Sequence, residues 1–398
     1  MVQEDSTITH GIETLALHAG AAADPTTGAL LTPIYQTTTY RQEAVGQDKG
    51  YTYSRAGNPT VTALEKRLAA LENAEYATCF SSGLSATTAL FLGLLQAGDR
   101  IVASQACYGG TVRLIEQLLA KFGVIAEFID TSSEGDLRTA LSAPTRLVFI
   151  ETPANPTLRL TDIRLAATLA HDARALLVVD NTLLTPALQK PLDLGADVSL
   201  HSTTKFIEGH NATIGGALIT NDKELHERFD FVRKSTGTIQ APFDAWLTLQ
   251  GVKTLPLRIR QHSENALAIA KFLSAHPRIA SLHYPGLDSF PQHDLVARQQ
   301  AAGGALISFE VEGGVDAGIE LMNSVKLCAL AENLGSAETL ITHPASMTHA
   351  AVSVEQCNSA GITDGLVRLS VGLEDPSDII ADLTQALAKR EKSKEVAK

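Results

Sequence analysis

Short apolar segments that alternate with helical stretches constrain the fold of this chain more than any other feature. Seven such segments, each predicted as a strand, lie at residues 76–81, 100–105, 125–130, 146–151, 175–180, 197–202 and 214–220. Helical patterns separate most of them and lie at residues 84–96, 110–121, 134–142 and 161–172. This alternation predicts an α/β fold in which a mostly parallel sheet carries helices on both faces. Ligands of such sheets bind outside the carboxyl ends of the strands.

The pattern also divides the chain into three predicted parts. Residues 1–58 are polar and weakly periodic, which predicts an extended arm. Residues 59–250 carry the alternating pattern, which begins with a helix near Thr60. After residue 250 the pattern changes to long helices and a second set of strands, so 251–398 is predicted as a smaller C-terminal domain. The strands of that second set lie at residues 281–284, 304–310 and 366–371.

Charge and cysteine spacing limit the partners of the 398-residue chain. Its formal net charge of -12 argues against nucleic acid as a main partner, because phosphate backbones require basic surface. The cysteines form no CxxC pair, which favours reduced thiols over disulfides or a zinc site. They are Cys79, Cys107, Cys328 and Cys357. The N-terminus lacks a signal-peptide pattern and no apolar run could span a bilayer, so we expect a cytoplasmic protein without a membrane partner.

Polar side chains follow three of the predicted strands where these strands end. Asn155 comes after the strand 146–151, Asp180 ends the strand 175–180, and Lys205 comes after the strand 197–202. Each is 25 residues from the next, about one strand–helix or strand–loop unit. Because the carboxyl ends of parallel strands meet at one edge, the three side chains are expected to converge there.

These residue types suit a cofactor that carries an aldehyde, a pyridine ring and a phosphate. A lysine amine forms an imine with the aldehyde, and a carboxylate keeps the pyridine nitrogen protonated. The turn at 81–84 before a predicted helix offers backbone N–H groups to the phosphate, and Ser202 and Thr204 add hydroxyl donors. Any one of these residues alone is more often a solvated loop residue, a cap or a turn residue. The prediction depends on their conjunction.

Other catalytic motifs are not met. The run at 83–87 lacks the final glycine of a hydrolase nucleophile elbow, and neither GxxxxGK[ST] nor GxGxxG after the first strand occurs. His343 and His349 lie six residues apart, which is not the spacing of a helical metal pair. They are expected to be helix caps or core histidines, and no metal is expected.

The residues resemble the Cys/Met-metabolism pyridoxal-phosphate enzymes, a family that is also called cystathionine γ-synthase-like. The stretch 197–211, DVSLHSTTKFIEGHN, is similar to the lysine signature of that family along its whole length. The resemblance spans nearly the whole chain in register. It also includes YSRAGNPT (53–60), SSGLSA (81–86), CYGGT (107–111), ETPANPT (151–157), HPASMTH (343–349) and VRLSVGLED (367–375).

The resemblance implies a fold and a set of cofactor contacts. The fold would be the type I fold of pyridoxal-phosphate transferases, with a mostly parallel seven-stranded sheet and a smaller C-terminal α/β domain. Lys205 would hold the cofactor as a Schiff base and shuttle protons, Asp180 would pair with the pyridine nitrogen, and Tyr108 would stack on the ring and act as acid or base. The groups implied to hold the phosphate are Gly83, Leu84, Ser202 and Thr204.

The resemblance further implies substrate contacts and an oligomer. Asn155 would contact the ring oxygen and the substrate carboxylate, which Arg368 would bind bidentately. Tyr53 and Arg55 would reach the phosphate of a neighbouring subunit. The implied assembly is a homotetramer built as a dimer of dimers, with a small amino-acid substrate as the other partner.

Five positions bear on the substrate. Gly110 stands where methionine γ-lyases usually carry a cysteine, and Glu332 is similar to the cystathionine enzymes. Thr52 stands where those enzymes often have an acidic residue, while Asn333 replaces a usual serine near the carboxylate site. The sequence AsnAlaThr at 211–213 replaces a usual SerAsp or AsnAsp sequence. These departures leave the preferred substrate open.

The resemblance implies elimination or replacement at Cγ of a sulfur amino acid or an O-acylhomoserine, of the cystathionine γ-synthase or γ-lyase type. The sequence does not choose between synthase and lyase, because both reactions share their intermediates. Methionine γ-lyase, homocysteine-forming sulfhydrylase and cystathionine β-lyase are alternatives within the family. A silent pyridoxal-phosphate-binding regulator and a scaffold protein are alternatives from other classes.

Overall fold

A seven-stranded sheet forms the centre of the structure, a computed structural model that describes residues 10–347 and 361–388. The strands follow the order β1-β7-β6-β5-β4-β2-β3, and β7 runs antiparallel to both of its neighbours. They are β1 (Tyr76–Phe80), β2 (Arg100–Ser104), β3 (Ile125–Ile129), β4 (Leu147–Glu151), β5 (Leu176–Asp180), β6 (Val198–His201) and β7 (Gly216–Thr220). The predicted mostly parallel seven-stranded sheet is confirmed.

Helices cover both faces of this sheet because successive side chains of each strand point to opposite faces. In β4, Leu147 and Phe149 pack in a cluster with α3 and α8, whereas Val148 and Ile150 pack with α5 and α6. The helices of this half are α2 (Pro59–Leu71), α3 (Gly83–Leu94), α4 (Gly109–Arg113), α5 (Glu134–Ala140), α6 (Ile163–Asp172), α7 (Thr185–Leu188), α8 (Lys223–Thr236) and α9 (Pro242–Lys253).

The helix expected at 110–121 has three different helical geometries. It begins as α4, continues as a π-helix over Leu114–Leu118 and ends as a 3-10 helix over Leu119–Phe122. Gly123 ends it with a φ of 81°, a conformation that glycine adopts without strain. The apolar periodicity was therefore right about the buried face, but it does not report the hydrogen-bond pattern.

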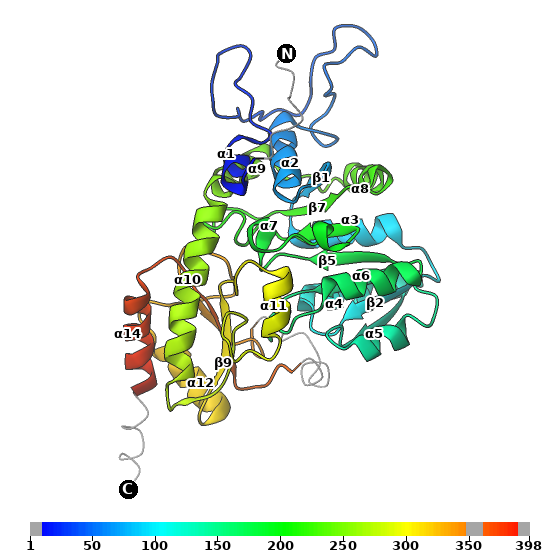
Figure 1. Cartoon of the computed structure of the whole chain (residues 1–398). Helices are drawn as coiled ribbons and strands as arrows, with labels where there is room; N and C mark the ends of the chain where they lie inside the picture. Colours follow the sequence, from blue (N-terminus) through cyan, green and yellow to red (C-terminus); the bar gives the residue numbers. More distant parts are fainter. Residues whose placement is uncertain (1–9, 348–360, 389–398) are drawn as a thin grey trace.

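A second sheet forms in the C-terminal part, with the order β10-β11-β12-β9-β8. Its strands are β8 (Ile279–His283), β9 (Leu306–Val311), β10 (Ala329–Leu330), β11 (Leu340–Thr342) and β12 (Leu366–Ser370). The sequence had not predicted β10 and β11, which are too short to show a period. Helix α10 (Leu255–Ser274) runs along the molecule from the N-terminal helices to this sheet (Figure 1). The remaining helices are α11 (His293–Gln299), α12 (Gly314–Ser324) and α14 (Pro376–Leu387).

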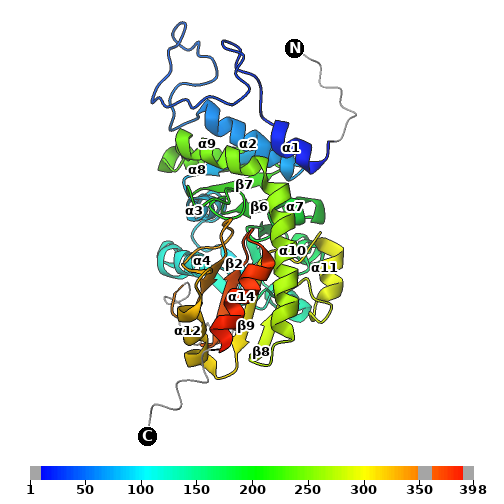
Figure 2. The ribbon, with the colours of Figure 1, turned by 90° about the vertical axis from the view of Figure 1, so that its left-hand side faces the viewer.

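The chain before α2 forms helix α1 (Ile12–His18) and then long loops. Figures 1 and 2 show these blue loops standing out beyond α2. Leu30 and Val45 on the loops are 86% and 102% exposed, so they have little contact within this chain. The described parts thus include an extended arm, while the domain boundaries after residues 58 and 250 stay predictions.

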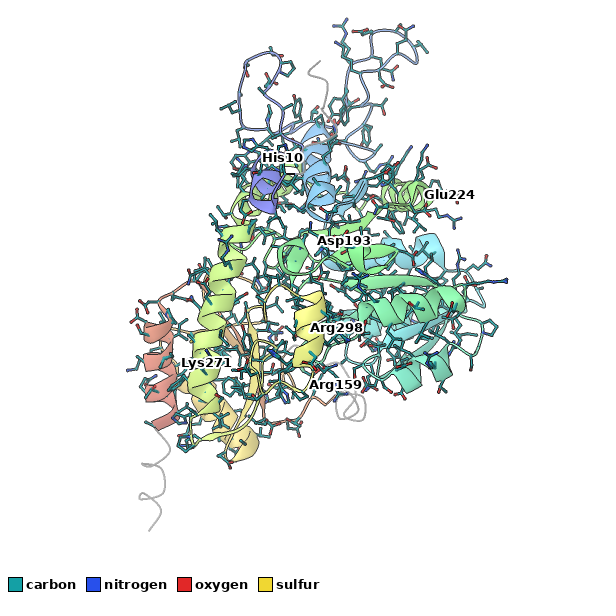
Figure 3. The ribbon with its side chains drawn as sticks, viewed as in Figure 1. His10, Arg159, Asp193, Glu224, Lys271 and Arg298 are labelled. Carbon is teal, nitrogen blue, oxygen red and sulfur yellow. The ribbon has the colours of Figure 1, made fainter. Side chains whose placement is uncertain are left out.

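Several helices carry charged side chains on their outer faces. Lys271 on α10 and Glu224 on α8 are exposed and point away from the core (Figure 3). In the described part of the chain, no helix has both the length and the apolar character needed to cross a membrane.

Close packing of α9 gives a prediction about stability. A Cβ atom on Gly251 would lie 2.1 Å from the backbone oxygen of Glu208, so alanine there must push two backbones apart. We expect Gly251→Ala to lower the free energy of unfolding by about 1–3 kcal/mol, measured by urea unfolding followed by circular dichroism. The matched control is Gly135→Ala in α5, where the nearest atom to the new Cβ is 3.7 Å away. Equal unfolding midpoints for the two variants would show that α9 can shift away from Glu208 without loss of stability.

Candidate active site

Lys205 lies in a tight turn that follows β6. Its backbone N–H donates to the oxygen of Ser202 at 3.2 Å, and its side-chain Nζ donates to Asn333 Oδ1 at 2.6 Å. Gly335 lets the loop that carries Asn333 pack closely against the turn at Lys205, because a Cβ at position 335 would lie 2.5 Å from the backbone nitrogen of Phe206. Burial, and after it the nearby Arg368 charge, lower the pKa of Lys205 to about 8. The amine is therefore more easily neutralised than an ordinary lysine.

Asp180 ends β5 and pairs in register with Glu151 at the end of β4. One of its oxygens accepts the backbone N–H of Thr182 at 3.0 Å. Burial raises the pKa of Asp180, while the hydrogen bonds from Thr182 and the His201 charge oppose that rise. A nearby cationic N–H would stabilise its charged form.

The amino end of α3 lies against the loop that follows β6. A Cβ on Gly83 would be 2.8 Å from Ser202 Cβ and 2.9 Å from its Oγ, so glycine permits this contact. Ser82 caps the helix by accepting the N–H of Ser85 at 3.0 Å, and the first N–H groups of a helix lack intrahelical acceptors. Ser202 donates its own backbone N–H to Thr182 Oγ1 at 2.8 Å, which links this loop to the end of β5.

Arg368 projects from β12 of the second sheet and is 2% exposed. Its guanidinium donates to Asn155 Oδ1 at 3.0 Å, to the backbone oxygen of Asn333 at 2.9 Å and to Thr342 Oγ1 at 3.3 Å. Burial lowers its pKa to about 10, and the charges of Glu151 and Glu332 oppose this change. The group stays cationic at neutral pH and lies within the network that reaches Lys205.

Glu151 was not singled out from the sequence, yet it fixes two of the predicted site residues. Its carboxylate accepts the backbone N–H of Tyr108 at 2.8 Å and that of Asn155 at 3.0 Å. It is buried, and burial together with the Asp180 charge raises its pKa well above the usual range. A polar residue that ends a fully apolar strand was the signal that could have identified it.

Tyr108 lies directly over Gly110. A Cβ on Gly110 would be 2.4 Å from a carbon of the tyrosine ring, so any other residue there must displace the ring. Tyr108 is 43% exposed, and Gly110 borders a hollow of about 330 Å³ that Leu84 and Arg113 also line. The structure therefore places Gly110, Leu84 and the cationic side chain of Arg113 around one opening.

Two of the sequence departures contact each other. Asn333 donates its amide to Asn211 Oδ1 at 2.7 Å, while its own Oδ1 accepts from Lys205. Asn211 in turn donates to Ser336 Oγ at 2.6 Å and adopts a φ of 54°. The replacements at 333 and 211 thus form one hydrogen-bonded unit that ends on the lysine amine.

Some predicted residues lie apart from this cluster. Arg55 donates to the backbone oxygen of Lys234 at 2.6 Å and lies 5.5 Å from the ring of Tyr53, which is 46% exposed. Glu332 is exposed, and its negative charge acts on the site by raising the pKa of Arg368 against the effect of burial.

His343 is buried and hydrogen-bonded to Ser346 and to a backbone oxygen, as expected of a core histidine. His349 lies outside the described residues.

The donor set fits pyridoxal phosphate. Lys205 offers a desolvated amine, and Asp180 offers a carboxylate at the end of the neighbouring strand. A helix N-terminus at Gly83, with the hydroxyls of Ser202 and Thr204, offers donors to a phosphate. Thr204 Oγ1 lies 3.0 Å from the backbone nitrogen of Gly215, which fixes the loop that carries it.

Known proteins resemble this chain over nearly its whole length. A family model described as Cys/Met metabolism PLP-dependent enzyme matches residues 13–388. The L-methionine gamma-lyase of Fusobacterium nucleatum subsp. polymorphum is 45% identical over 96% of this chain and 98% of that protein. The cystathionine gamma-synthase of Mycobacterium tuberculosis (strain ATCC 25618 / H37Rv) is 46% identical over 97% of this chain and 100% of that protein. The crystal structure of cystathionine gamma synthase from Xanthomonas oryzae pv. oryzae in complex with cystathionine has a TM-score of 0.95 and 43% identity, over 96% of this chain and 99% of that chain.

The electrostatics of the site predict how Lys205 titrates in the cofactor-free protein. Its amine should become reactive as the pH rises through about 8, because its pKa is lowered to that value. Arg368→Leu removes one of the two causes, so the pKa should rise and labelling of Lys205 at pH 8 should fall. Pulse acetylation with mass spectrometry measures this, with the exposed Lys271 as internal reference (Figure 3). Unchanged labelling of Lys205 would show that the two cations do not interact.

Proposed function

The chain belongs to the Cys/Met metabolism PLP-dependent enzymes, and we propose that it catalyses elimination or replacement at Cγ of a sulfur amino acid or an O-acylhomoserine. The proposed type is that of cystathionine γ-synthases and γ-lyases. Relatives with both names support it, at 46% identity over 97% and 94% of this chain.

One observation carries the proposal for this chain. Lys205 Nζ, Asn333, the Arg368 guanidinium and Asn155 are joined in sequence by hydrogen bonds of 2.6–3.0 Å. An amine that can form an imine thus lies beside a buried cation that can bind a carboxylate. An α-amino acid has the amine and the carboxylate that this pair requires.

When bound, pyridoxal phosphate supplies an aldehyde that an amine can join and a ring that accepts electrons. We assign Lys205 Nζ as the amine that holds it and that moves protons at Cα and Cβ of the substrate. Asp180 would hold the proton of the ring nitrogen, and Tyr108 would stack on the ring and act as acid or base. Arg368 and Asn155 would bind the substrate α-carboxylate and so orient its Cα–H bond toward the lysine.

The remaining assignments concern the phosphate and the side chain of the substrate. Gly83, Leu84, Ser202 and Thr204 would hold the phosphate. Asn333 and the exposed Glu332 would face the substrate, where the carboxylate of Glu332 suits a distal amine such as that of cystathionine.

Methionine γ-lyase is a second candidate, because the relative from Fusobacterium nucleatum with that name is 45% identical over 96% of this chain. Gly110 distinguishes the two candidates. Methionine γ-lyases usually carry a cysteine at this position, whereas here the Tyr108 ring lies where such a side chain would begin, with a ring carbon 2.4 Å from the place of its Cβ.

Parallel assays of the purified enzyme test the proposed reaction. We expect turnover of cystathionine, or of an O-acylhomoserine with cysteine, above that of methionine and homocysteine, measured as 2-oxo acid and as thioether product. Lys205→Ala should remove the lysine-bound absorbance of the cofactor and lower turnover by about 10³-fold or more. Methionine as best substrate would favour the second candidate. No turnover of any of these compounds, with cofactor bound, would favour a silent regulator.

We also propose a homo-oligomer, a tetramer formed as a dimer of dimers, in which the arm completes the site of a neighbour. Tyr53 and Arg55 are on the arm, and among the described residues they contact each other and the backbone of Lys234 rather than the Lys205 cluster of their own chain. Leu30 and Val45 on the same arm present apolar surface that a neighbour could bury.

A cytoplasmic location is likewise a proposal, supported by the free buried thiols of Cys79, Cys107 and Cys328.

Mixing two inactive variants tests whether the site is shared. Arg55→Ala keeps Lys205, and Lys205→Ala keeps Arg55, so a mixed dimer holds one intact site if Arg55 acts in trans. After subunit exchange we expect about a quarter of the wild-type activity, because half of the dimers would be mixed. Absence of recovery, with exchange shown by native mass spectrometry, would mean that each chain completes its own site.

A further inference from the structure

A fully buried polar network lies behind the ends of the central strands. Glu72, which follows α2, accepts the Nε2–H of His201 at 2.5 Å and the hydroxyl of Ser199 at 2.8 Å, and the side chains of Glu72 and His201 are 0% exposed. The amide of Asn181 also reaches the Glu72 oxygen, at 3.3 Å, and donates to the backbone oxygen of Gln189 at 2.8 Å. The Gln189 amide returns a hydrogen bond to Asn181 Oδ1 at 3.0 Å.

This network connects the three strand ends that carry the proposed catalytic groups. His201 ends β6 and directly precedes the loop with Ser202 and Lys205. Asn181 directly follows Asp180 on β5. The amide of Gln189 extends the network to β4, because it donates to the backbone oxygen of Thr152 at 2.9 Å. The network therefore contacts β4, β5 and β6 within a few residues of Asn155, Asp180 and Lys205, respectively.

The outer side of the network is anchored at the end of α2. Asn73 donates to the Asp193 carboxylate at 3.0 Å and accepts from Lys190 Nζ at 2.8 Å. Asp193, labelled in Figure 3, lies in the short 3-10 helix Leu192–Leu194. The residue next to Glu72 is thus bonded to the segment at 190–193, which anchors the end of α2.

Burying these groups costs stability, which indicates that the network has another use. Within the described residues, Glu72 Oε2, His201 Nδ1 and Gln189 Oε1 have no hydrogen-bond partner. Buried polar groups without full hydrogen bonding are often less stable than apolar residues of the same volume. An apolar cluster would join α2 to the sheet at least as well, but it would not fix the direction of three strand ends.

We propose that Glu72 and His201, through Asn181 and Gln189, are positioning residues that fix Asp180 and Lys205 relative to each other at the carboxyl edge of the sheet. The substrate-binding groups Arg368 and Asn333 belong to the other sheet and its loops, and Asn155 is also held by Glu151, so the network acts on proton transfer more than on substrate binding. The His201 charge opposes the rise that burial causes in the pKa of Asp180, which is consistent with this closeness.

Three variants separate positioning from simple loss of stability. His201→Leu removes the hydrogen bond to Glu72, whereas His201→Gln can still donate from an amide nitrogen. Glu65→Gln is the matched control, because Glu65 lies on α2, forms a partly buried ion pair with Arg233 and contacts β1 through the backbone of Cys79, outside the three strands that the network joins. The readouts are kcat, KM, the melting temperature and the visible circular dichroism of the bound cofactor.

We expect His201→Leu to lower kcat about ten-fold, with KM within two-fold of the wild type, and to weaken the circular dichroism band of the cofactor. His201→Gln should recover most of both signals, and Glu65→Gln should lower only the melting temperature. If His201→Leu does not fold, Gln189→Met breaks the same network at its other end and should lower kcat and the band in the same direction.

Two results would overturn the inference. One is a His201→Leu or Gln189→Met enzyme that melts earlier but keeps its kcat and its circular dichroism band. The other is a Glu65→Gln enzyme that loses both signals equally. The kcat measurement depends on the proposed function, whereas the circular dichroism of the cofactor requires no substrate. A failed reaction with an altered band would therefore reject the proposed function and keep the inference.

Discussion

A single buried guanidinium joins the two sheets of this molecule. Arg368 extends from the second sheet to Asn155, which follows a strand of the first, and to the backbone of Asn333 beside Lys205. A cation this buried is stable only when its partners are in place, because water cannot solvate it. The carboxylates of Glu151 and Glu332 provide the opposing charge. Correct packing of the sheets and assembly of the site are consequently one event.

The sequence predicted most of the first sheet and part of the site. Fully buried parallel strands require long apolar runs, and these runs located Asp180 and Lys205 at strand ends. It did not reveal the contacts between Lys205 and Asn333 or between Glu72 and His201, whose partners are 128 and 129 residues apart. Such pairs depend on how elements pack in three dimensions. No local period encodes that packing.

Two neighbouring carboxylates show how the surroundings assign different tasks to one chemical group. Glu151 and Asp180 pair across adjacent strands, and burial raises the pKa of both. Glu151 is surrounded by backbone N–H groups of its own chain, so its hydrogen bonds fix the loops of Tyr108 and Asn155. Asp180 has Thr182 as its neighbour and is more open. One carboxylate is thus committed to the scaffold while the other remains available to a ligand.

The contact between Gly110 and the Tyr108 ring has a consequence for how this enzyme can diverge. Position 110 borders the hollow that Leu84 and Arg113 also line, and methionine γ-lyases usually carry a cysteine at this position. Any side chain there first meets the tyrosine ring. A lineage could therefore not change selectivity at this position without also moving a proposed acid–base group. Evolution toward a new substrate would have to pass through variants in which both properties change together.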